Sequence, residues 1–474
     1  MSETLDFGAI VLIVAGGFTA AVAMSKLTEF FPVPGPALFL LAAAVLSDVF
    51  PGLTLPIRSV ERIGVVALIA ILFDGGMHVG RRRFRTSALE ITVLGVVGTF
   101  ATAGLVAVAC HVFFGFGWTT SGVIGAALAP TDPAVMFSVL GKREIGGRSG
   151  TILEGESGAN DPVGIALMIG MLDFAAHDHA SFWVVVREFA IEMGVGLAIG
   201  VAGAQVLLPL MRRVALPSEA LYPIRTLAFA GVVYGVATIA HGSGFLAVFV
   251  TALLIGDERA PRKGEIERFH TSLASLAEIV VFTTLGLTIE LGKLGQGHVW
   301  LEGLLLALVL AFVARPAVVW PLLAPTRLRP GERLFVMWGG LKGAVPILLG
   351  TLALLQGVHD ATRVYQIVFV VVAFSVIVQG TTIPFVAPAL GIPMRLAEPR
   401  AVRRLVVGQG SRADGTSVAG AMLGHGSWIE RVRRDGVDLP VRGSLVLRAG
   451  DEVWLIADAD DAGRLGPLFR PAAG

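Results

Sequence analysis

The residues best suited to chemistry lie between Glu156 and Asp161, in the run Glu-Ser-Gly-Ala-Asn-Asp. The segment that follows, 163–171, is apolar enough to lie in lipid. An ionisable side chain at the centre of a bilayer costs about 3 kcal/mol or more, so such side chains mark functional sites. Oxygen ligands without thiol or imidazole groups suit a hard cation. The run therefore predicts an ion site that takes Na+ or K+.

Two further segments combine charged groups with helix breakers. Ala-Pro-Thr-Asp-Pro at 129–133 contains Asp132, and Gly-Gly-Leu-Lys-Gly-Ala-Val-Pro at 339–346 contains Lys342. Proline removes a backbone donor and glycine favours unwinding, so each helix should break near mid-membrane and leave carbonyl and amide groups facing a cavity. Broken helices at matching places in two halves indicate a transporter's binding site. The alternative is a pair of structural proline kinks.

The two regions together predict an oxygen-rich pocket. Its members would be Asp132, Asp161, Ser157, Asn160 and the freed carbonyls, with a monovalent cation at Asp132 and Asp161. Burial favours the neutral form of a carboxylate, so a proton and a cation would compete for Asp161. Such competition, combined with rocking of one helix bundle against another, gives antiport. The alternative is a buried hydrogen-bond network that only orders two helices.

Five charged residues need separate interpretation. Arg315 lies in an apolar run and requires a buried partner, for which Glu156 is the candidate. We interpret this as a structural ion pair, although Glu156 as a second proton carrier stays open. Asp74 either lines an ion path or caps the cytoplasmic approach, and Glu278 is interpreted as a hydrogen-bond partner within the bundle. Lys342 should offset the carbonyl-rich ends of the half-helices.

The composition requires a membrane to hold these residues. The 474 residues are 54% hydrophobic and only 15% charged, with a mean hydropathy of +0.77, which is outside the range of soluble domains. Lys plus Arg (37) balances Asp plus Glu (36), so charge gives no indication of a nucleic-acid partner. We expect an all-α polytopic membrane protein in a lipid bilayer. Its predicted spans are 7–24, 35–50, 62–79, 88–112, 119–140, 151–172, 182–210, 224–240, 243–256, 271–289, 300–320, 334–355 and 364–388.

Basic residues indicate the orientation of these thirteen spans. The loops after spans 3, 5, 7, 9 and 11 hold sixteen Lys and Arg residues, whereas the intervening loops hold few. Cytoplasmic loops are enriched in such residues, so the amino terminus should lie outside and the carboxyl end in the cytoplasm. Thirteen divides as six, one and six, which predicts inverted repeats whose fifth and twelfth spans are crossed broken helices.

The carboxyl-terminal part has a different composition. Residues beyond about 400 are rich in Arg and Asp and contain β-like runs at 404–407, 444–448 and 452–457. We predict a transmembrane domain at 1–390, a linker at 391–401 and a small cytoplasmic α/β domain at 402–474. Its glycines do not form a dinucleotide-binding fingerprint.

Three motifs carry a resemblance to a known family. Thr131-Asp132-Pro133, the run Glu156 to Pro162 and the run Gly340 to Val345 together resemble the monovalent cation/proton antiporter-1 superfamily, the sodium/proton exchangers and their bacterial relatives. The resemblance covers the chain to about residue 390. It implies that Asp161 is the essential transport carboxylate, that Thr131, Asp132 and Ser157 lie at the ion, and that Asn160 binds the unwound helix. It also implies the Glu156–Arg315 pair, a homodimer and electroneutral one-for-one exchange.

Two features resemble the bacterial potassium/proton branch of the cytoplasmic (inner) membrane. Lys342 stands where exchangers often have arginine, and residues 403–469 resemble an RCK carboxy-terminal (TrkA-C type) domain. This favours K+ over Na+ and implies regulation, in some such tails by a small ligand. We expect no cofactor beyond the transported K+ or Na+ and H+. A Na+/H+ antiporter with a regulatory tail is the alternative.

Two other functions remain for comparison. Gly155-Glu156-Ser157-Gly158 matches the GxSG of rhomboid-type intramembrane proteases, with His241 as a conceivable base. Asn160-Asp161 follows immediately, however, and thirteen spans exceed what that fold needs. A tail-gated potassium channel would require a TVGYG-like filter, which the sequence lacks.

Overall fold

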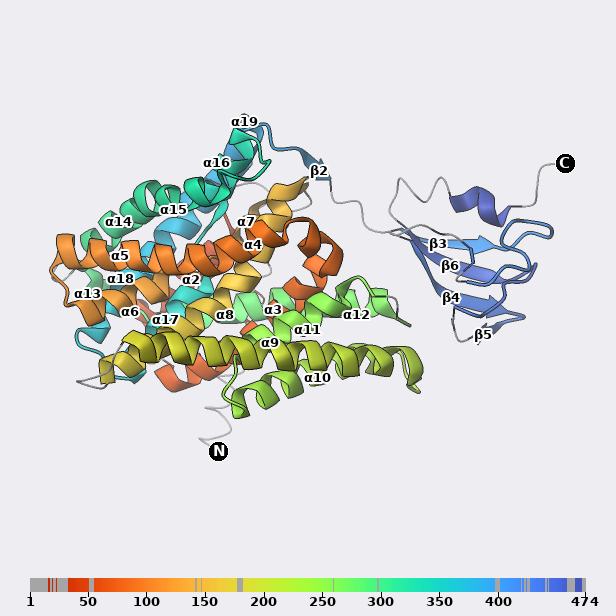
Figure 1. Ribbon diagram of the computed structural model, residues 1–474, viewed down its shortest axis with the longest axis horizontal. Coiled ribbons are helices and arrows are strands. Elements are labelled where there is room, and N and C mark those ends of the chain that lie inside the picture. The colour runs from red at the N-terminus through yellow and green to blue at the C-terminus, as the bar shows by residue number, and fades with distance from the viewer. Residues whose placement is uncertain are drawn as a thin grey trace. The chain divides into compact units, whose positions relative to one another are not determined.

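The computed structural model describes a helical membrane part and a small carboxyl-terminal sheet (Figure 1). Within the described residues, nine helices are long and apolar enough to cross a membrane, and two shorter helices are also apolar. The protein is therefore a multi-pass membrane protein. The described residues are 16, 17, 19, 23, 33–50, 55–140, 143–145, 147–176, 182–258, 260–295, 298–396, 401–418, 420, 421, 423, 427–439, 441, 443–457 and 465–470.

The helices follow the predicted spans closely. Twelve of the thirteen predictions coincide with a helix or an interrupted helix. The first, 7–24, lies almost entirely outside the described residues, so the count of thirteen and the inverted repeat stay predictions. The helices are α2 (Gly35–Val49), α3 (Ile57–Thr86), α4 (Ala88–Thr92), η2 (Val93–Gly98), α5 (Thr99–Phe114), α6 (Trp118–Leu128), α7 (Ala134–Leu140), α8 (Arg148–Ala176), α9 (Phe182–Arg213), α10 (Leu221–Ile239), α11 (Gly244–Gly256), α12 (Lys263–Gly286), α13 (Leu291–Leu294), α14 (Val299–Val309), η4 (Leu310–Ala314), α15 (Arg315–Leu323), α16 (Pro330–Gly339), α17 (Ala344–Leu355), α18 (Ala361–Phe374), η5 (Ser375–Gln379) and α19 (Gly380–Ala389).

Burial separates the central spans from the peripheral ones. The span Pro330–Leu355, which contains α16 and α17, is 78% buried, and Arg148–Ala176 is 61% buried. Val185–Arg213 is only 28% buried, and α9 and α10 lie along one side of the helical part in Figure 1. An apolar helix that is mostly unburied within the protein can face lipid at little cost. The polar spans of the candidate site are thus the ones shielded by other helices.

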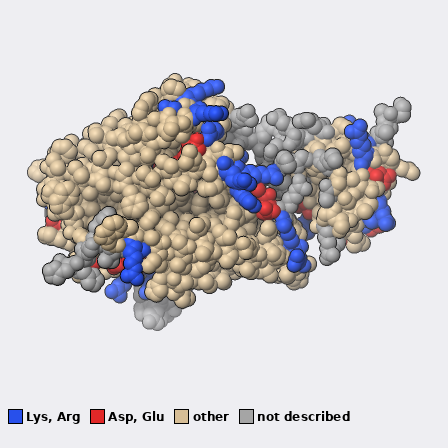
Figure 2. All heavy atoms as spheres, in the orientation of Figure 1, with Lys and Arg blue, Asp and Glu red and all other residues tan. Residues whose placement is uncertain are grey.

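Charged side chains are sparse on the surface of the helical part. In the face shown in Figure 2, most of this surface carries neither Lys, Arg, Asp nor Glu, and the basic side chains gather in a few patches. One basic patch belongs to the end of α3, where four arginines, at 81, 82, 83 and 85, are exposed. This distribution fits a surface covered by lipid between two polar rims.

The carboxyl-terminal sheet has four antiparallel strands in the order β3-β6-β4-β5. Val432, Val453 and Leu455 belong to its buried apolar cluster. The predicted strand at 452–457 is present and the one at 404–407 overlaps β3, but 444–448 forms only an isolated bridge through Val446, so that strand prediction is wrong. The strands are β3 (Ala401–Val406), β4 (Trp428–Arg434), β5 (Val437–Leu439) and β6 (Glu452–Ala457); β1 (Arg143–Ile145) and β2 (Met394–Leu396) form a separate pair.

The chain divides into two compact units. All residues of the candidate site belong to the first, and the carboxyl-terminal sheet belongs to the second. The first unit comprises Met1–Val206, Leu227–Asp257 and His270–Arg395, and the second comprises Leu207–Thr226, Glu258–Phe269 and Leu396–Gly474.

Candidate ion-binding site

The two predicted helix breaks are present and lie side by side. α6 ends at Leu128 and α7 begins at Ala134, while α16 ends at Gly339 and α17 begins at Ala344. The backbone N–H of Asp132 donates to the carbonyl of Leu341 at 2.8 Å. The two unwound segments therefore satisfy part of each other's backbone, as buried backbone must.

Asp132 binds the first turns of both downstream half-helices. Its Oδ1 accepts from the backbone N–H of Ala134 at 2.9 Å, and its Oδ2 accepts from that of Ala344 at 3.4 Å. Helix N-termini carry partial positive charge and unpaired N–H groups, so one carboxylate stabilises two helices. Each carboxylate oxygen keeps a further lone pair, so this capping leaves Asp132 able to contact a cation.

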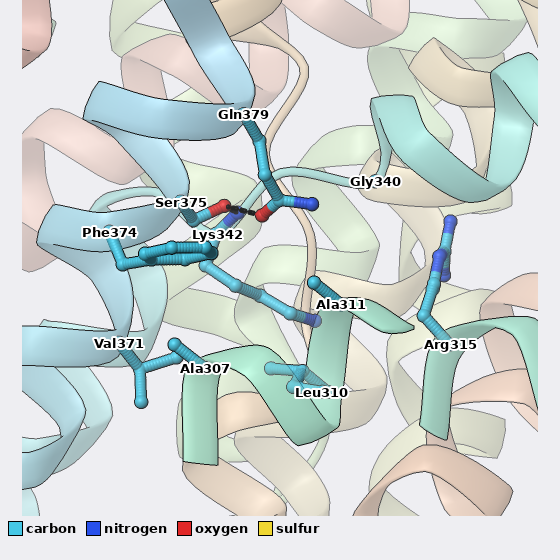
Figure 3. Close-up of a pocket in the computed structure, with 10 residues that line it drawn as sticks. All are labelled: Ala307, Leu310, Ala311, Arg315, Gly340, Lys342, Val371, Phe374, Ser375 and Gln379. Carbon is cyan, nitrogen blue, oxygen red and sulfur yellow. Dashed lines mark hydrogen bonds between the residues drawn. The ribbon is translucent and has the colours of Figure 1, made fainter. Parts of the chain in front are cut away.

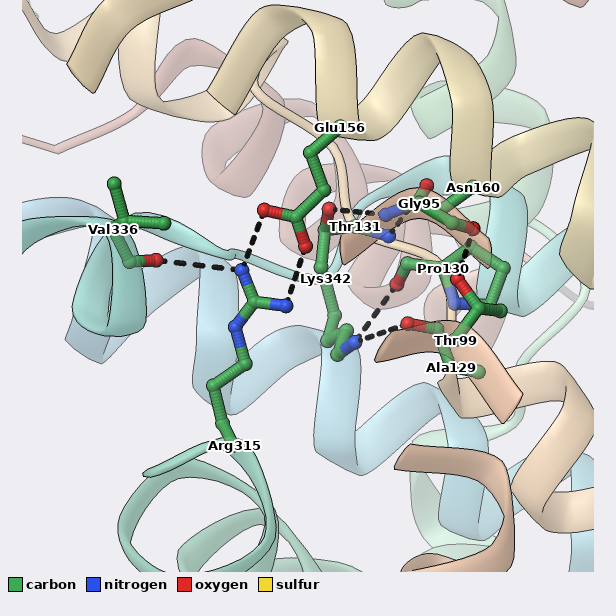
Figure 4. A network of polar contacts seen from close by, with 10 residues as sticks. All are labelled: Gly95, Thr99, Ala129, Pro130, Thr131, Glu156, Asn160, Arg315, Val336 and Lys342. Carbon is green, nitrogen blue, oxygen red and sulfur yellow. Dashed lines mark hydrogen bonds and ion pairs between the residues drawn. The ribbon is translucent and has the colours of Figure 1, made fainter. Parts of the chain in front are cut away.

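Lys342 binds the carboxyl-terminal end of α6, the helix that precedes the first break. Its Nζ donates to the carbonyls of Ala129 and Pro130 at 2.8 and 2.9 Å (Figure 4). These carbonyls follow the end of α6, where the macrodipole is negative. Lys342 is 2% exposed, so its charge is held away from solvent beside those carbonyls.

Asn160 fastens α8 to the first unwound segment. Its Oδ1 accepts from the backbone N–H of Thr131 at 3.2 Å, and its Nδ2 donates to Thr131 Oγ1 at 2.7 Å (Figure 4). Both polar atoms of the Asn160 amide thus bond to Thr131. Asn160 therefore places the next residue of α8, Asp161, beside the break.

The carboxylate of Asp161, beside the break, lacks a hydrogen bond to one of its oxygen atoms within the described residues. It is 4% exposed, and within the described part of the chain its Oδ1 is buried without a hydrogen-bond partner. The charges of Asp132 and Lys342 both act on it. Ser157, one turn earlier on α8, is 5% exposed. A buried acceptor without a donor is costly, so Oδ1 is the place where a proton or a cation would be stabilised.

Glu156 and Arg315 are brought together as a bidentate pair. Arg315 Nη1 and Nη2 donate to the two carboxylate oxygens at 2.5 and 2.9 Å, and both side chains are at most 6% exposed. Nη2 also donates to the carbonyl of Val336 at 3.3 Å. In Figure 4 no dashed line joins this pair to the Asn160–Thr131 contact. The geometry is that of a pair joining α8 to α15.

Lys342 also lines a small cavity together with residues of α14, α18 and the two π-helical segments η4 and η5 (Figure 3). Its volume is about 10 Å³, which is room for about one water molecule. Lys342 N donates to Ser375 Oγ at 2.8 Å, and Ser375 Oγ donates to Gln379 Oε1 at 2.6 Å. The cavity is lined by Ala307, Leu310, Ala311, Arg315, Gly340, Lys342, Val371, Phe374, Ser375 and Gln379.

Sequence reasoning missed the π-helical turns that border this cavity. η4 directly precedes Arg315, and η5 runs from Ser375 to Gln379. π-helical turns often occur at functional sites, and here η5 presents Ser375 and Gln379 to the second break. No breaker residue in either turn signals them, because Leu-Ala-Phe-Val-Ala and Ser-Val-Ile-Val-Gln both read as ordinary helix.

Asp74 lies on α3, and its contacts are with α12 and α3. Its Oδ1 accepts from Thr271 Oγ1 at 3.1 Å, and the ring Nδ1 of His78 lies 3.4 Å from the same oxygen. The structure thus places Asp74 beside α12 instead of among the contacts of the two breaks.

The match to a family model decides the identity. The model described as "Sodium/hydrogen exchanger, transmembrane" matches residues 17–388, which is most of the chain. The chain belongs to the sodium/hydrogen exchanger family. The resemblance drawn from the three motifs is confirmed, and this member of the family is an ion antiporter, not an enzyme.

Curated relatives extend the match. The K(+)/H(+) antiporter NhaP of Alkalimonas amylolytica is 37% identical over 69% of this exchanger, although the match spans only 56% of that relative. The K(+)/H(+) antiporter NhaP2 of Shewanella oneidensis is 27% identical over 95% of the chain and 82% of the relative. The Na(+)/H(+) antiporter ApNhaP of Aphanothece halophytica is 25% identical over 86% of the chain and 78% of the relative.

A solved structure supports the fold of the membrane part. The sodium proton antiporter MjNhaP1 from Methanocaldococcus jannaschii superposes with a TM-score of 0.68 at 22% identity, covering 80% of this exchanger and all of that chain. The shared fold is thus established for most of the chain.

Proposed function

We propose that this exchanger moves one monovalent cation against one proton through Asp161. The observation that supports the proposal is the buried Oδ1 of Asp161, which has no hydrogen-bond partner among the described residues and lies beside two broken helices. An uncompensated charge is costly away from water, so the carboxylate takes up either a proton or a cation. Since the two compete for one oxygen, binding one displaces the other.

Alternating access follows from the cost of the empty site. A bare carboxylate is expensive to carry through the closed intermediate, whereas a neutralised one is not. Only the loaded forms then cross, one with a proton and one with a cation, which gives electroneutral exchange. The breaks in the two interrupted helices lie side by side, where one bundle can move against the other.

The surrounding residues receive separate roles in this proposal. Asp132, Thr131 and Ser157 contribute oxygen atoms to the cation, and Asn160 holds the unwound segment in place through its two bonds to Thr131. Lys342 compensates the end of α6. Glu156 and Arg315 form a structural pair outside the ion's path.

K+ is the favoured cation. The two relatives named above as K(+)/H(+) antiporters support it. The sequence resemblance of Lys342 and residues 403–469 to that branch supports it as well. The second candidate is Na+/H+ exchange, which the family description and the relative from Aphanothece halophytica favour. The pocket offers oxygen atoms, which both ions accept.

Assembly and orientation are part of the proposal. We expect a homodimer in the bacterial inner membrane, with the amino terminus outside. The domain at 402–474 would lie in the cytoplasm and act as an RCK carboxy-terminal-like regulatory domain for a small ligand or a regulatory subunit. The basic loops support the orientation, and the sheet of β3 to β6 falls in this part of the chain.

Reconstituted transport tests the function and the ion. Proteoliposomes would be given gradients of Na+, K+, Rb+ or Li+ between about pH 6 and about pH 9, and proton movement would be followed with a fluorescent dye. We expect K+ and Rb+ to drive proton movement better than Na+ and Li+. A preference for Na+ would favour the second candidate, and proton movement with none of the four would overturn the proposal.

A further inference from the structure

α12 carries a line of polar side chains through an otherwise apolar span. Thr271, Ser275 and Glu278 are separated by four and three residues, so they lie on one face of the helix. The span has a mean hydropathy of 1.3 over its most apolar window. Polar groups repeated on one face at membrane depth are expensive against lipid, and they mark a water-filled route.

The exposure of this face falls along the helix. Thr271 and Ser275 are exposed, Glu278 is half-buried, and Asp161 at the helix breaks is buried. Arg262 directly precedes α12, and Lys263 and Arg268 lie in its first two turns, in the segment that the basic residues assign to the cytoplasm. The polar face therefore leads from the cytoplasmic end of α12 toward the centre of the membrane.

The outer end of this face is already joined to Asp74. Thr271 Oγ1 donates to Asp74 Oδ1 at 3.1 Å, and Ser275 Oγ donates to the carbonyl of Thr271 at 3.0 Å. Asp74 has a side chain that is only 14% exposed. A carboxylate from α3 and two hydroxyls from α12 thus stand together where the route begins.

Glu278, at the inner end, lacks the partner expected of it. Within the described residues its Oε1 is buried without a hydrogen bond, so its interpretation as a bundle hydrogen-bond partner fails for that oxygen. The charge that acts on Glu278 is that of Asp132. Two carboxylates whose charges act on each other repel, unless a cation lies between them. Such a cation would supply the buried Oε1 of Glu278 with the positive partner that a hydrogen-bond donor would otherwise provide.

We propose that Glu278 is a second cation-binding carboxylate, which holds the incoming monovalent cation beside Asp132 on the cytoplasmic side of Asp161. The inference rests on the proposed cation/proton exchange and deepens it. Thr271, Ser275 and Asp74 line the route, and Glu278 passes the cation to the helix breaks. Glu278 therefore sets the apparent affinity at the cytoplasmic face, whereas Asp161 couples the cation to the proton.

The test compares both faces of the membrane for Glu278→Gln, which keeps the shape of the side chain and removes its charge. Proton movement would be measured at increasing K+ in everted vesicles, whose outer face is the cytoplasmic one, and in right-side-out vesicles. We expect the KM for K+ to rise about tenfold at the cytoplasmic face, which corresponds to about 1.4 kcal/mol, and to stay within about twofold at the other face. The maximal rate should change less than about twofold.

Matched variants separate this role from a structural one. Glu290→Gln removes an exposed carboxylate near the opposite end of α12 and should leave both KM values unchanged. Glu278→Asp restores the charge and should give a KM between those of the wild type and Glu278→Gln. If Glu278→Gln does not fold, the KM of Glu278→Asp, raised about threefold at the cytoplasmic face alone, decides the question.

Three results would overturn the inference. An unchanged cytoplasmic KM in folded Glu278→Gln would do so, as would a lower maximal rate with no change in KM, which a purely structural role predicts. The third is a wild-type chain that moves no protons in any cation gradient, which would remove the proposed function as well. The first two leave wild-type exchange intact, so the two failures are distinguishable.

Discussion

Asp132 and Gly343 approach each other so closely that position 343 has no room for a side chain. A Cβ there would lie 1.9 Å from Oδ2 of Asp132. The contact explains why the second break contains glycine at this position: the Asp132 carboxylate reaches the first turn of α17 across it, while it also caps α7. One side chain thus holds both half-helices at the distance that the site requires.

Gly343→Ala should therefore damage transport. The added methyl group must displace the Asp132 carboxylate or the backbone, because the contact involves a short, capped side chain. We expect at least about a tenfold fall in cation-driven proton movement with folded protein still present. The control is Gly231→Ala on α10, where no atom lies within 4 Å of a Cβ. Equal activity of both variants would contradict the assigned contact.

Glu156→Gln tests the structural pair. The substitution leaves the Arg315 guanidinium buried without a charged partner, which costs about 3–5 kcal/mol. We expect a markedly lower melting temperature in detergent. Glu302→Gln removes a bidentate partner from the more exposed Arg363, and it should cost about 1 kcal/mol or less. A normal melting temperature of Glu156→Gln with lost transport would instead favour Glu156 as a second proton carrier.

Lys342→Met examines the compensation of the first break. Methionine keeps much of the length but removes both hydrogen bonds to the carbonyls of Ala129 and Pro130. Two buried carbonyls would then lack a donor, at about 1–3 kcal/mol each. The melting temperature and the transport rate should both fall. Lys293→Met, which removes an exposed lysine, should change neither; an unaffected Lys342→Met would contradict the assigned role.

Asp451 in the carboxyl-terminal sheet region gives a pH dependence with a defined sign. Burial raises the pKa of Asp451, but hydrogen bonds from Arg434 and from the backbone of Arg448 outweigh it and hold the pKa below its usual value of 3.8. The stabilisation is thus complete above about pH 4 and is lost as the pH falls toward the folded pKa.

Hydrogen–deuterium exchange of β4 and β6 in the full chain would measure this. Corrected for intrinsic rates, wild-type protection should fall below about pH 4, whereas Asp451→Asn should be less protected at neutral pH and change little below it. Asp438→Asn removes an exposed pair and serves as the control. A wild-type profile that is flat below pH 4 would contradict the pKa shift.

Much of the membrane part could be predicted because its signals are local. Apolar runs of spanning length locate the helices, and proline and glycine mark the two breaks. Arg315 in an apolar run demands a buried acid, and Glu156 is the candidate that the structure places against it, although it lies far away in the sequence. The helices and the breaks need only the chemistry of a residue and its immediate neighbours, and the pair needs only the demand of a buried charge for a partner.

The remaining features depend on contacts between distant segments. The capping of α17 by Asp132 needs the two breaks to meet, which no local pattern specifies. The π-helical turn that carries Ser375 and Gln379 contains no breaker. Glu278 has the sequence context of an ordinary bundle residue, and only the structure shows that its Oε1 has no hydrogen-bond partner among the described residues. In the tail, Ser-Leu-Val-Leu-Arg at 444–448 is a short β-like run but forms only one bridge.

The central claim is that Asp161 carries both the proton and the cation. Asp161→Asn keeps the size of the side chain and removes the charge, so the fold should be retained while a cation loses its anionic ligand. The most direct measurement is proton movement driven by a K+ gradient in proteoliposomes of purified Asp161→Asn, with the melting temperature as the check on folding. The account predicts that this movement is abolished in a folded protein. Proton movement at the wild-type rate would contradict it.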